Sequence, residues 1–286
     1  KQHHRSGGTR MKTTIHDLYR SPLCLWVEDP LTHEVLTALW ADVQISILVA
    51  DGKQGVAHML RGLPKRVQGK VFGLVDRDFD DDNHQQWSQQ SCQVLRLPAH
   101  EFENLLLDCQ VLSELSGAES ASDIEARAKR HAEALLYFMV CKGVLREMQR
   151  ALGSGFPVDP PQSLPDLQAA ADHIRNSPYW ATHHSAWGQW NSEPARRAAL
   201  EREEARLRSD LDTGTWLRSF SGKEIFHRLR AEVPQLDKTP VRPPSPSSAD
   251  RDLDLAKRIA AKMRESDRIP PVLTELRQVL RSKAAL

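Results

Sequence analysis

The chain has 286 residues and a formal net charge of +1 at pH 7, with 39 Lys and Arg against 38 Asp and Glu. This length suffices for one large domain or two smaller ones. The balanced charge excludes a global electrostatic signature of nucleic-acid or membrane binding, so local patches or metal ions must attract any polyanion. No apolar stretch approaches the roughly 20 residues that span a bilayer, and none resembles a signal peptide. We therefore expect a cytoplasmic protein without a membrane partner.

The first half of the chain alternates short apolar runs with helical patterns. We expect residues 1–12, which are mostly polar and basic, to be a flexible segment or a cloning remnant outside the fold. Strands are expected at 23–27, 45–50, 71–75 and 93–97, and helices at 31–41, 53–61 and 100–108. Strands that alternate with helices predict an α/β fold with a mainly parallel sheet and right-handed crossovers.

The second half is dominated by strong helix formers. Helices are expected within 123–152, 194–211, 250–265 and 271–282, with a Pro/Gly loop at 153–165. The Pro- and Ser-rich stretch at 234–248 is expected to be an exposed linker. The predicted organisation is therefore an α/β domain over 13–110, followed by a mostly α-helical domain over 111–286.

The most informative segment is the apolar run Val71 to Val75, which ends in Asp76-Arg77-Asp78. Such a run is typical of a buried parallel strand, and ligands bind beyond the carboxyl ends of such strands. Because side chains alternate with period two, we expect Asp76 and Asp78 on the same side of the pleat. Two like charges so close require a cation, a basic partner or a proton, and Mg²⁺ favours such oxygen ligands. The acids at 80–82 are interpreted as a turn.

Other acidic residues follow the neighbouring strands. Glu28 comes after the first strand, and Glu101 and Glu103 lie at the helix after the fourth. Parallel strands share one carboxyl edge, so these groups should converge with Asp76 and Asp78, which is what Mg²⁺- or Mn²⁺-assisted phosphoryl chemistry requires. Glu28 could be a metal ligand or the base that orients a water. Glu101 is equally well explained as a charge that suits a helix N-terminus.

Two lysines are candidates for contacts with phosphate. Lys53 follows Gly52 beyond the second strand, where a solvated lysine at a helix start is nearly as good an explanation. Lys223 follows Ser221, which with Glu224 forms a capping-box pattern for a helix start. Both interpretations of Lys223 can hold, because a helix N-terminus also binds phosphate.

These motifs together resemble the Toprim domain, in the branch of OLD-type nucleases and of the nuclease effector of PARIS anti-phage systems. Trp26-Val27-Glu28 is similar to the strand-end glutamate of that branch, and Asp51-Gly52-Lys53 to its Gly-Lys turn. The segment from Val71 to Phe79 resembles its Asp-x-Asp strand, 97–106 its His-Glu-x-Glu-Asn signature, and 219–226 a downstream Gly-Lys-Glu element. The order and spacing agree over roughly residues 20–110. The glycine and aspartate that commonly follow the first glutamate are absent.

The resemblance implies a catalytic site of Glu28, Asp76, Asp78 and Lys223, with Glu28, Asp76, Asp78 and Glu103 around Mg²⁺ or Mn²⁺. It implies an endonuclease that hydrolyses phosphodiester bonds, a toxic effector of antiviral defence and abortive infection. The nucleic-acid substrate would be RNA rather than DNA, with tRNA as one target. An ABC-type ATPase partner would control it, and a homodimer is a further possibility.

Two alternatives stay open. Four hydrophobic residues before Asp-x-Asp also resemble the nucleophile strand of haloacid-dehalogenase-like phosphatases, in which Asp76 would attack the phosphate. Those enzymes usually carry this motif near the N-terminus, whereas a strand-helix-strand unit precedes it here. The non-enzyme alternative is an inactive Toprim adaptor whose helical half binds a partner.

Two features of the helical half have no assigned role. The aromatic and histidine cluster could stack bases or belong to the core; its members are Trp180, His183, His184, Trp187 and Trp190. The arginines within 194–211 could touch a phosphate backbone, but the interspersed glutamates also suit a solvated helix.

Overall fold

The computed structural model describes residues 21–63, 67–152, 159–177, 188–237 and 246–284. A four-stranded, all-parallel sheet has the order β2-β1-β3-β4, with β1 (Cys24–Val27), β2 (Ser46–Val49), β3 (Val71–Val75) and β4 (Val94–Arg96). The prediction of an α/β fold with a parallel sheet is therefore confirmed. In the central strand, Trp26 lies opposite Leu48 on one side and Gly73 on the other. The carboxyl ends of all four strands consequently lie at one edge.

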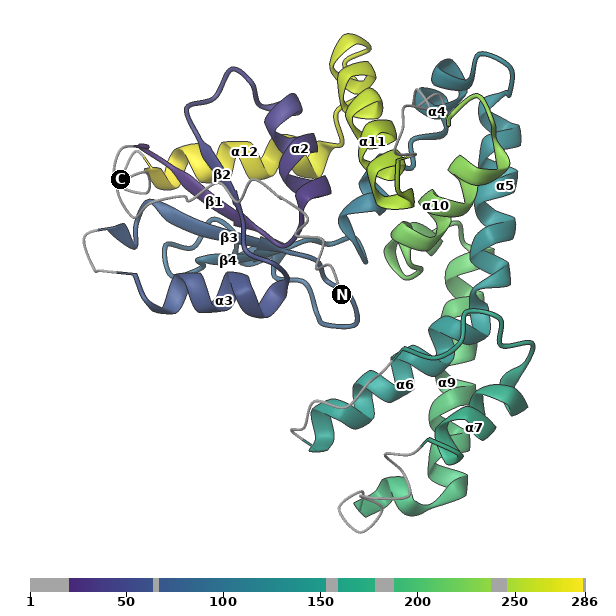
Figure 1. Cartoon of the computed structure of the whole chain (residues 1–286). Helices are drawn as coiled ribbons and strands as arrows, with labels where there is room; N and C mark the ends of the chain where they lie inside the picture. Colours follow the sequence, from purple (N-terminus) through teal and green to yellow (C-terminus); the bar gives the residue numbers. More distant parts are fainter. Residues whose placement is uncertain (1–20, 64–66, 153–158, 178–187, 238–245, 285–286) are drawn as a thin grey trace, which may run out of the picture.

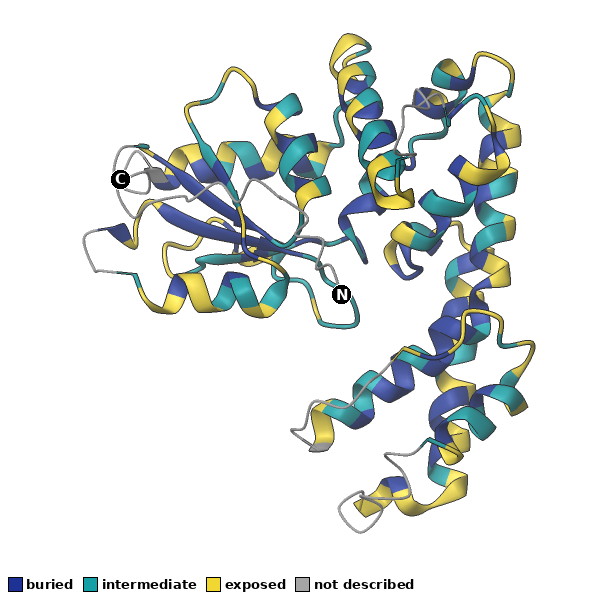
Figure 2. Cartoon of the chain, viewed as in Figure 1, coloured by how far each residue is buried: buried dark blue, intermediate teal, exposed yellow. Residues whose placement is uncertain are grey.

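Helices cover both faces of this sheet (Figure 1). On one face α3 (Lys53–Arg61) packs on a core that includes Trp26. On the other face α2 (Pro30–Leu39) and α12 (Pro271–Ala284) pack over a core that includes Phe72. Every residue of β1 and β3 is buried (Figure 2), which explains their continuous apolar sequences.

Gly73, in the middle of β3, allows α3 to approach the sheet closely. A Cβ at this position would lie 2.4 Å from Val56 Cγ1 and 3.0 Å from Leu60 Cδ1. Both contacts are far shorter than van der Waals distance, so a larger residue would push α3 away from β3. Since Lys53 is the first residue of α3, this packing also sets the distance of Lys53 from the carboxyl edge.

The segment after β4 differs from the sequence prediction. An α-helix over 100–108 was expected, but η3 (Phe102–Leu106) is a short 3-10 helix. The Asn104 side chain accepts the Glu101 N–H at 2.8 Å and donates to the Phe220 carbonyl at 3.0 Å. Asp108 then has extended backbone and caps the next helix, accepting the Gln110 N–H at 2.9 Å. These side-chain bonds compete with a continuous α-helix and end it.

The remaining segments are helical, as predicted. The pattern at 123–152 predicted one long helix or two, and two form, with Leu135 between α5 and α6. The helices of this part are α4 (Cys109–Ser116), α5 (Ala121–Ala134), α6 (Leu136–Leu152), α7 (Leu167–Arg175), α9 (Glu193–Asp212), α10 (Gly222–Glu232) and α11 (Ser248–Glu265), with 3-10 turns η2 (His84–Gln86), η5 (Gly188–Asn191) and η6 (Trp216–Arg218). Helices α6, α7 and α9 extend away from the sheet as an arm (Figure 1).

The last two helices return to the α/β part. Lys257 of α11 forms an ion pair with Glu34 of α2 at 2.7 Å, and Lys283 of α12 donates to the Cys92 carbonyl at 3.1 Å. The division at residue 110 stays a prediction, and the structure adds that residues on both sides of it share one packed region. Among the described helices, none has the length and apolarity needed to cross a membrane.

Some predicted features lie partly or wholly outside the described residues. Of the aromatic and histidine cluster, positions 180, 183, 184 and 187 are not described, whereas Trp190 is buried in the core. Of the expected linker, 238–245 is not described, and α11 begins at Ser248. The arginines of α9 mostly pair with glutamates, as in Arg197 with Glu201 at 2.9 Å, which agrees with a solvated helix.

Gly73→Ala should lower the free energy of unfolding by about 1–3 kcal/mol, because the added methyl overpacks the contact between β3 and α3. Urea unfolding followed by circular dichroism measures this. Gly62→Ala is the matched control, since a Cβ there meets no atom within 4 Å. Equal stability of the two variants would contradict the close packing.

Candidate metal and phosphodiester site

Glu28 accepts hydrogen bonds from the segments that follow β2 and β3, and so connects the carboxyl ends of three strands. It follows β1, its Oε1 accepts the Asp76 N–H at 2.8 Å, and its carbonyl accepts the Gly52 N–H at 2.8 Å. Burial raises the pKa of Glu28 to about 7, although the Asp76 N–H and the Lys53 charge favour the ionised form. Near neutral pH this carboxyl group can therefore both accept and release a proton.

Asp76 and Glu103 are acids whose negative charge has little compensation from positive groups nearby. Burial, followed by the Glu103 and Glu28 charges, raises the pKa of Asp76 well above its ordinary value. Glu103 is only 8% exposed, and burial followed by the Glu101 charge raises its pKa to about 8. Within the described part of the chain, neither carboxylate forms an ion pair with a basic side chain. Such groups take up a proton or a cation.

Asp78 does not lie on the same side of a pleat as Asp76, and that prediction is wrong. The strand ends at Val75, and Asp78 has the left-handed φ of 52° that aspartate tolerates better than most residues. Its N–H donates to the His100 carbonyl at 2.7 Å, and its carboxylate accepts from Lys53 Nζ at 2.8 Å. Burial alone would raise the pKa of Asp78, but the charge and hydrogen bond of Lys53 lower it.

Lys53 links two aspartates at this edge. Besides Asp78, its ammonium contacts Asp80 Oδ2 at 3.2 Å. Burial acts to lower the pKa of Lys53, but the charge of Asp78 and the hydrogen bond to it leave that pKa raised. Asp80, which the sequence assigned to a turn, therefore also participates in the charge arrangement of the site. The pairing keeps Lys53 protonated and close to the edge.

Glu101 holds the N-terminus of α10. Its Oε2 accepts from Ser221 Oγ and from the Lys223 N–H, both at 2.8 Å. The contact is close, since a Cβ at Gly222 would lie 2.4 Å from the Asn104 nitrogen. These bonds give Glu101 a role that neither interpretation of the sequence included: it anchors the helix that carries Lys223. Ser221 also caps this helix, as its sequence pattern predicted, by accepting the Glu224 N–H at 3.3 Å.

A cavity of about 560 Å³ collects most of these groups. Glu28, Asp76, Glu101, Glu103 and Lys223 line it together. The structure therefore brings five of the seven predicted residues to one cavity. Asp78 and Lys53 line an adjoining cavity of about 490 Å³, and Glu28 also lines this second cavity.

Further acids of the first cavity could not be foreseen from the sequence. Asp29 caps α2 by accepting the Thr32 N–H at 2.9 Å, and Asp252 of α11 pairs with Arg230 at 2.6 Å. These two acids already have partners, in contrast to Asp76 and Glu103. Asp252 stands far from the strands in sequence, so no local signal indicated that α11 forms a wall of the cavity.

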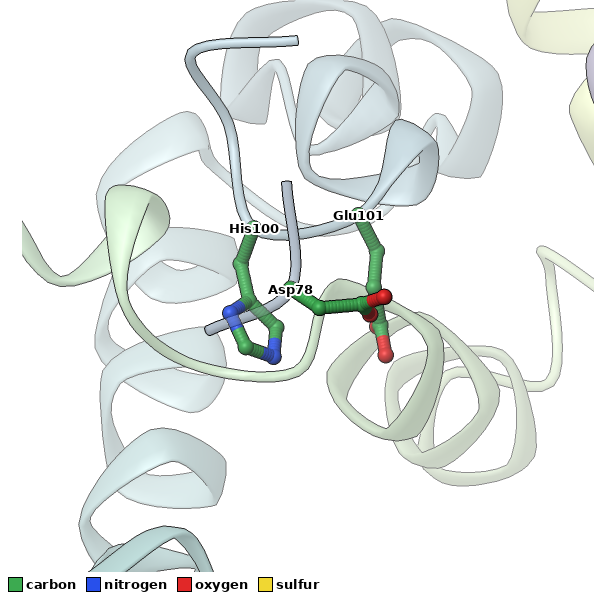
Figure 3. Close-up of side chains that lie close together, drawn as sticks. All are labelled: Asp78, His100 and Glu101. Carbon is green, nitrogen blue, oxygen red and sulfur yellow. The ribbon is translucent and has the colours of Figure 1, made fainter. Parts of the chain in front are cut away.

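Two sets of residues offer ligands for a divalent cation. Glu28, Asp76 and Glu103 line one cavity and carry oxygen ligands of the type that Mg²⁺ prefers, but their ligand atoms do not form a compact group in this structure. In addition, one ligand atom each of Asp78, His100 and Glu101 lie within 4.8 Å of one another (Figure 3). Burial lowers the pKa of His100 to about 3, so its imidazole is neutral at ordinary pH. His100 was not assigned a role from the sequence, although it belongs to the His-Glu-x-Glu-Asn segment.

Comparison of the chain with protein-family models, with curated proteins and with solved structures finds no significant match.

Glu103→Gln should stabilise the metal-free protein more at pH 8 than at pH 5. The raised pKa of Glu103 means that its contribution to stability is complete below about pH 4.5 and is lost as pH rises through about 8. Glutamine stays neutral, so the variant avoids this loss. Thermal unfolding in EDTA at both pH values measures the difference, and excess Mg²⁺ at pH 8 should stabilise the wild type more than the variant.

All variants contain the same other titrating groups, so the difference in stability between variants cancels their effects. His100 is one such group, and its lowered pKa makes stability fall as pH falls, opposite to the effect of Glu103. Glu265→Gln, which removes an exposed charge on α11, is the control and should behave as the wild type. An equal effect of Glu103→Gln at both pH values would contradict the burial of Glu103 as an uncompensated charge.

Proposed function

We propose that this chain is a metal-dependent nuclease that hydrolyses phosphodiester bonds at the carboxyl edge of its sheet. The observation that carries the proposal is the shared cavity of Glu28, Asp76 and Glu103, whose buried or half-buried carboxylates form no ion pair within the described part of the chain. Mg²⁺ or Mn²⁺ held by these three groups would polarise the phosphate and activate a water. Asp78 remains a candidate ligand through the neighbouring cluster with His100 and Glu101.

Glu28 is the proposed acid–base group. Its pKa of about 7 matches the requirement that a general base be poised near the working pH. Its Oε1 is oriented by the Asp76 N–H, and its other oxygen is left for a water or a metal ion. A fixed carboxylate of this kind accepts the proton of an attacking water without reorganisation.

The two lysines are proposed to stabilise negative charge on the substrate. Lys223 lines the carboxylate cavity from the first turn of α10, and Glu101 holds that turn in place. Lys53 lines the adjoining cavity, paired with Asp78. Positive groups fixed before the reaction are worth more than mobile ones, since they stabilise the charge that develops on the phosphate oxygens.

The finer identity proposed is a Toprim nuclease of the OLD-like branch that acts in anti-phage defence. It rests on the resemblance of motifs, and the parallel sheet with acids at its carboxyl edge is consistent with it. An RNA substrate such as tRNA, control by an ABC-type ATPase, a homodimer and a cytoplasmic location belong to the same proposal, by analogy.

Glu28→Gln should reduce cleavage by about 100-fold or more, the usual contribution of an acid–base group. Purified protein is incubated with labelled RNA and DNA in Mg²⁺ or Mn²⁺, and the ends are sequenced. Glu133→Gln, which changes an exposed glutamate on α5, is the matched control and should cut as the wild type. Equal cutting by both variants would contradict the role of Glu28.

The alternatives give different results in the same preparation. A phosphatase would form a covalent acyl-phosphate on Asp76 during turnover, detectable by mass spectrometry. The nuclease proposal predicts none, because its nucleophile is water. An inactive adaptor would show no Mg²⁺ or Mn²⁺ binding by calorimetry, with or without nucleic acid.

A further inference from the structure

Helix α6 brings two arginines to the edge of the candidate site. Arg146 and Arg150 are four residues apart and therefore lie on the same face of the helix. Both line the cavity of about 490 Å³, whose other walls include Glu28, Lys53 and Asp78. The arm formed by the helical half thus contributes the side of this cavity that faces the carboxyl edge of the sheet.

Neither arginine forms an ion pair with a carboxylate in the part of the chain that the structure describes, although the charge of Arg146 helps to lower the pKa of Asp78. Arg150 is exposed and donates to the Phe79 carbonyl at 3.2 Å. Arg146 donates to Gln149 Oε1 at 2.9 Å, and its buried Nε has no hydrogen-bond partner. Arginine has five N–H donors, so most of the donors of this pair remain available.

Other arginines of the arm differ in this respect. Arg202 of α9 pairs with Glu147 at 2.8 Å, and Arg206 with Glu203 at 2.7 Å. These ion pairs satisfy the charge within the helices. Arg146 and Arg150 are therefore distinguished from Arg202 and Arg206 because they form no such ion pair among the described residues and because they line the cavity that Glu28 and Lys53 share.

The two aspartates beside Lys53 in this cavity are paired with its ammonium. Lys53 lies between Asp78 and Asp80, at 2.8 and 3.2 Å, and the charge of Arg146 also acts on Asp78. The arginine pair thus faces a cavity in which the nearest aspartates already have a cation. An anion that enters from outside meets two guanidinium groups on one wall.

We propose that Arg146 and Arg150 bind a phosphate of the nucleic-acid strand next to the scissile phosphate. Glu28 and Gly52 line both this cavity and the carboxylate cavity, so a strand that places one phosphate at the metal ligands leads directly to α6. Guanidinium groups bind phosphate oxygens through paired hydrogen bonds. The volume also lies in the range of about 300–1,000 Å³ that is usual for ligand cavities. The proposal rests on the nuclease function, and it assigns α6 to substrate binding.

Binding without cutting tests this proposal. Full-length Glu28→Gln protein is titrated with labelled single strands of about 12 nucleotides, one RNA and one DNA of the same sequence, in Mg²⁺ at several salt concentrations. Adding Arg146→Gln and Arg150→Gln should weaken binding by about tenfold or more, because charged hydrogen bonds are lost. The slope of log K against log salt should fall by about 1 to 2.

The matched control removes the same charge elsewhere. Arg130→Gln with Arg197→Gln changes two arginines that pair with Glu232 and Glu201 and line neither cavity. The nucleic-acid affinity and the salt slope of this control variant should stay close to those of the Glu28→Gln protein. The Mn²⁺ affinity and the thermal unfolding temperature should be the same in both double variants. If the α6 double variant does not fold, the single variant Arg150→Gln, at an exposed position, replaces it in the binding experiment.

The outcomes separate this proposal from the nuclease proposal. Equal affinities of the α6 variant and its control would overturn the role of Arg146 and Arg150, even if the wild type cuts nucleic acid. Loss of binding only in the α6 variant supports that role, even if no cleavage by the wild type is found. Equal loss with RNA and DNA indicates that the pair recognises the shared phosphate backbone.

Discussion

The structure of the site depends on buried and half-buried carboxylates that form no ion pair with a basic side chain of the described residues. Glu28, Asp76 and Glu103 come from three segments of the chain, and burial is the largest cause of the raised pKa of each. Burying a charge in this way is costly unless a proton or a cation joins it. Near neutral pH the cavity must therefore hold protons or attract a divalent ion. The repulsion among these carboxylates and their partial removal from water destabilise the fold in the absence of a cation, and the same features favour binding of the metal ion that the proposed chemistry requires.

The helices after the sheet complete the site. Glu101 fixes the first turn of α10 through Ser221 and the Lys223 N–H, and α11 closes the carboxylate cavity with Asp252. Helix α6 carries the arginines of the adjoining cavity. Lys223, the acidic residue Asp252 and the two arginines thus come from three different helices. Helix α10 packs against η3 and α11 packs against α2, so the helical half takes part directly in the geometry of the site.

The sequence predicted the parts of this arrangement that follow from local rules. The apolar run before Asp76 predicted a buried parallel strand, and the shared edge of parallel strands predicted its proximity to Glu28. It could not predict the turn at Asp78, because a left-handed residue breaks the period-two pattern on which that expectation rested. The sequence also could not predict that Asp252 and Arg146 would line the two cavities. An amphipathic helix pattern indicates which face is buried, but it does not say which distant segment the polar face will meet.

The most direct measurement is a crystal structure of the protein soaked with Mn²⁺, with data collected at a wavelength where manganese scatters anomalously. We expect an anomalous peak in the carboxylate cavity, at about 2.0–2.2 Å from oxygens of Glu28, Asp76 and Glu103, because Mn²⁺ binds the same hard oxygen ligands as Mg²⁺. A second peak beside Asp78 and His100 would add a second metal position. An ordered cavity without a peak, or a peak at another surface alone, would contradict the claim that Glu28, Asp76 and Glu103 form a metal centre.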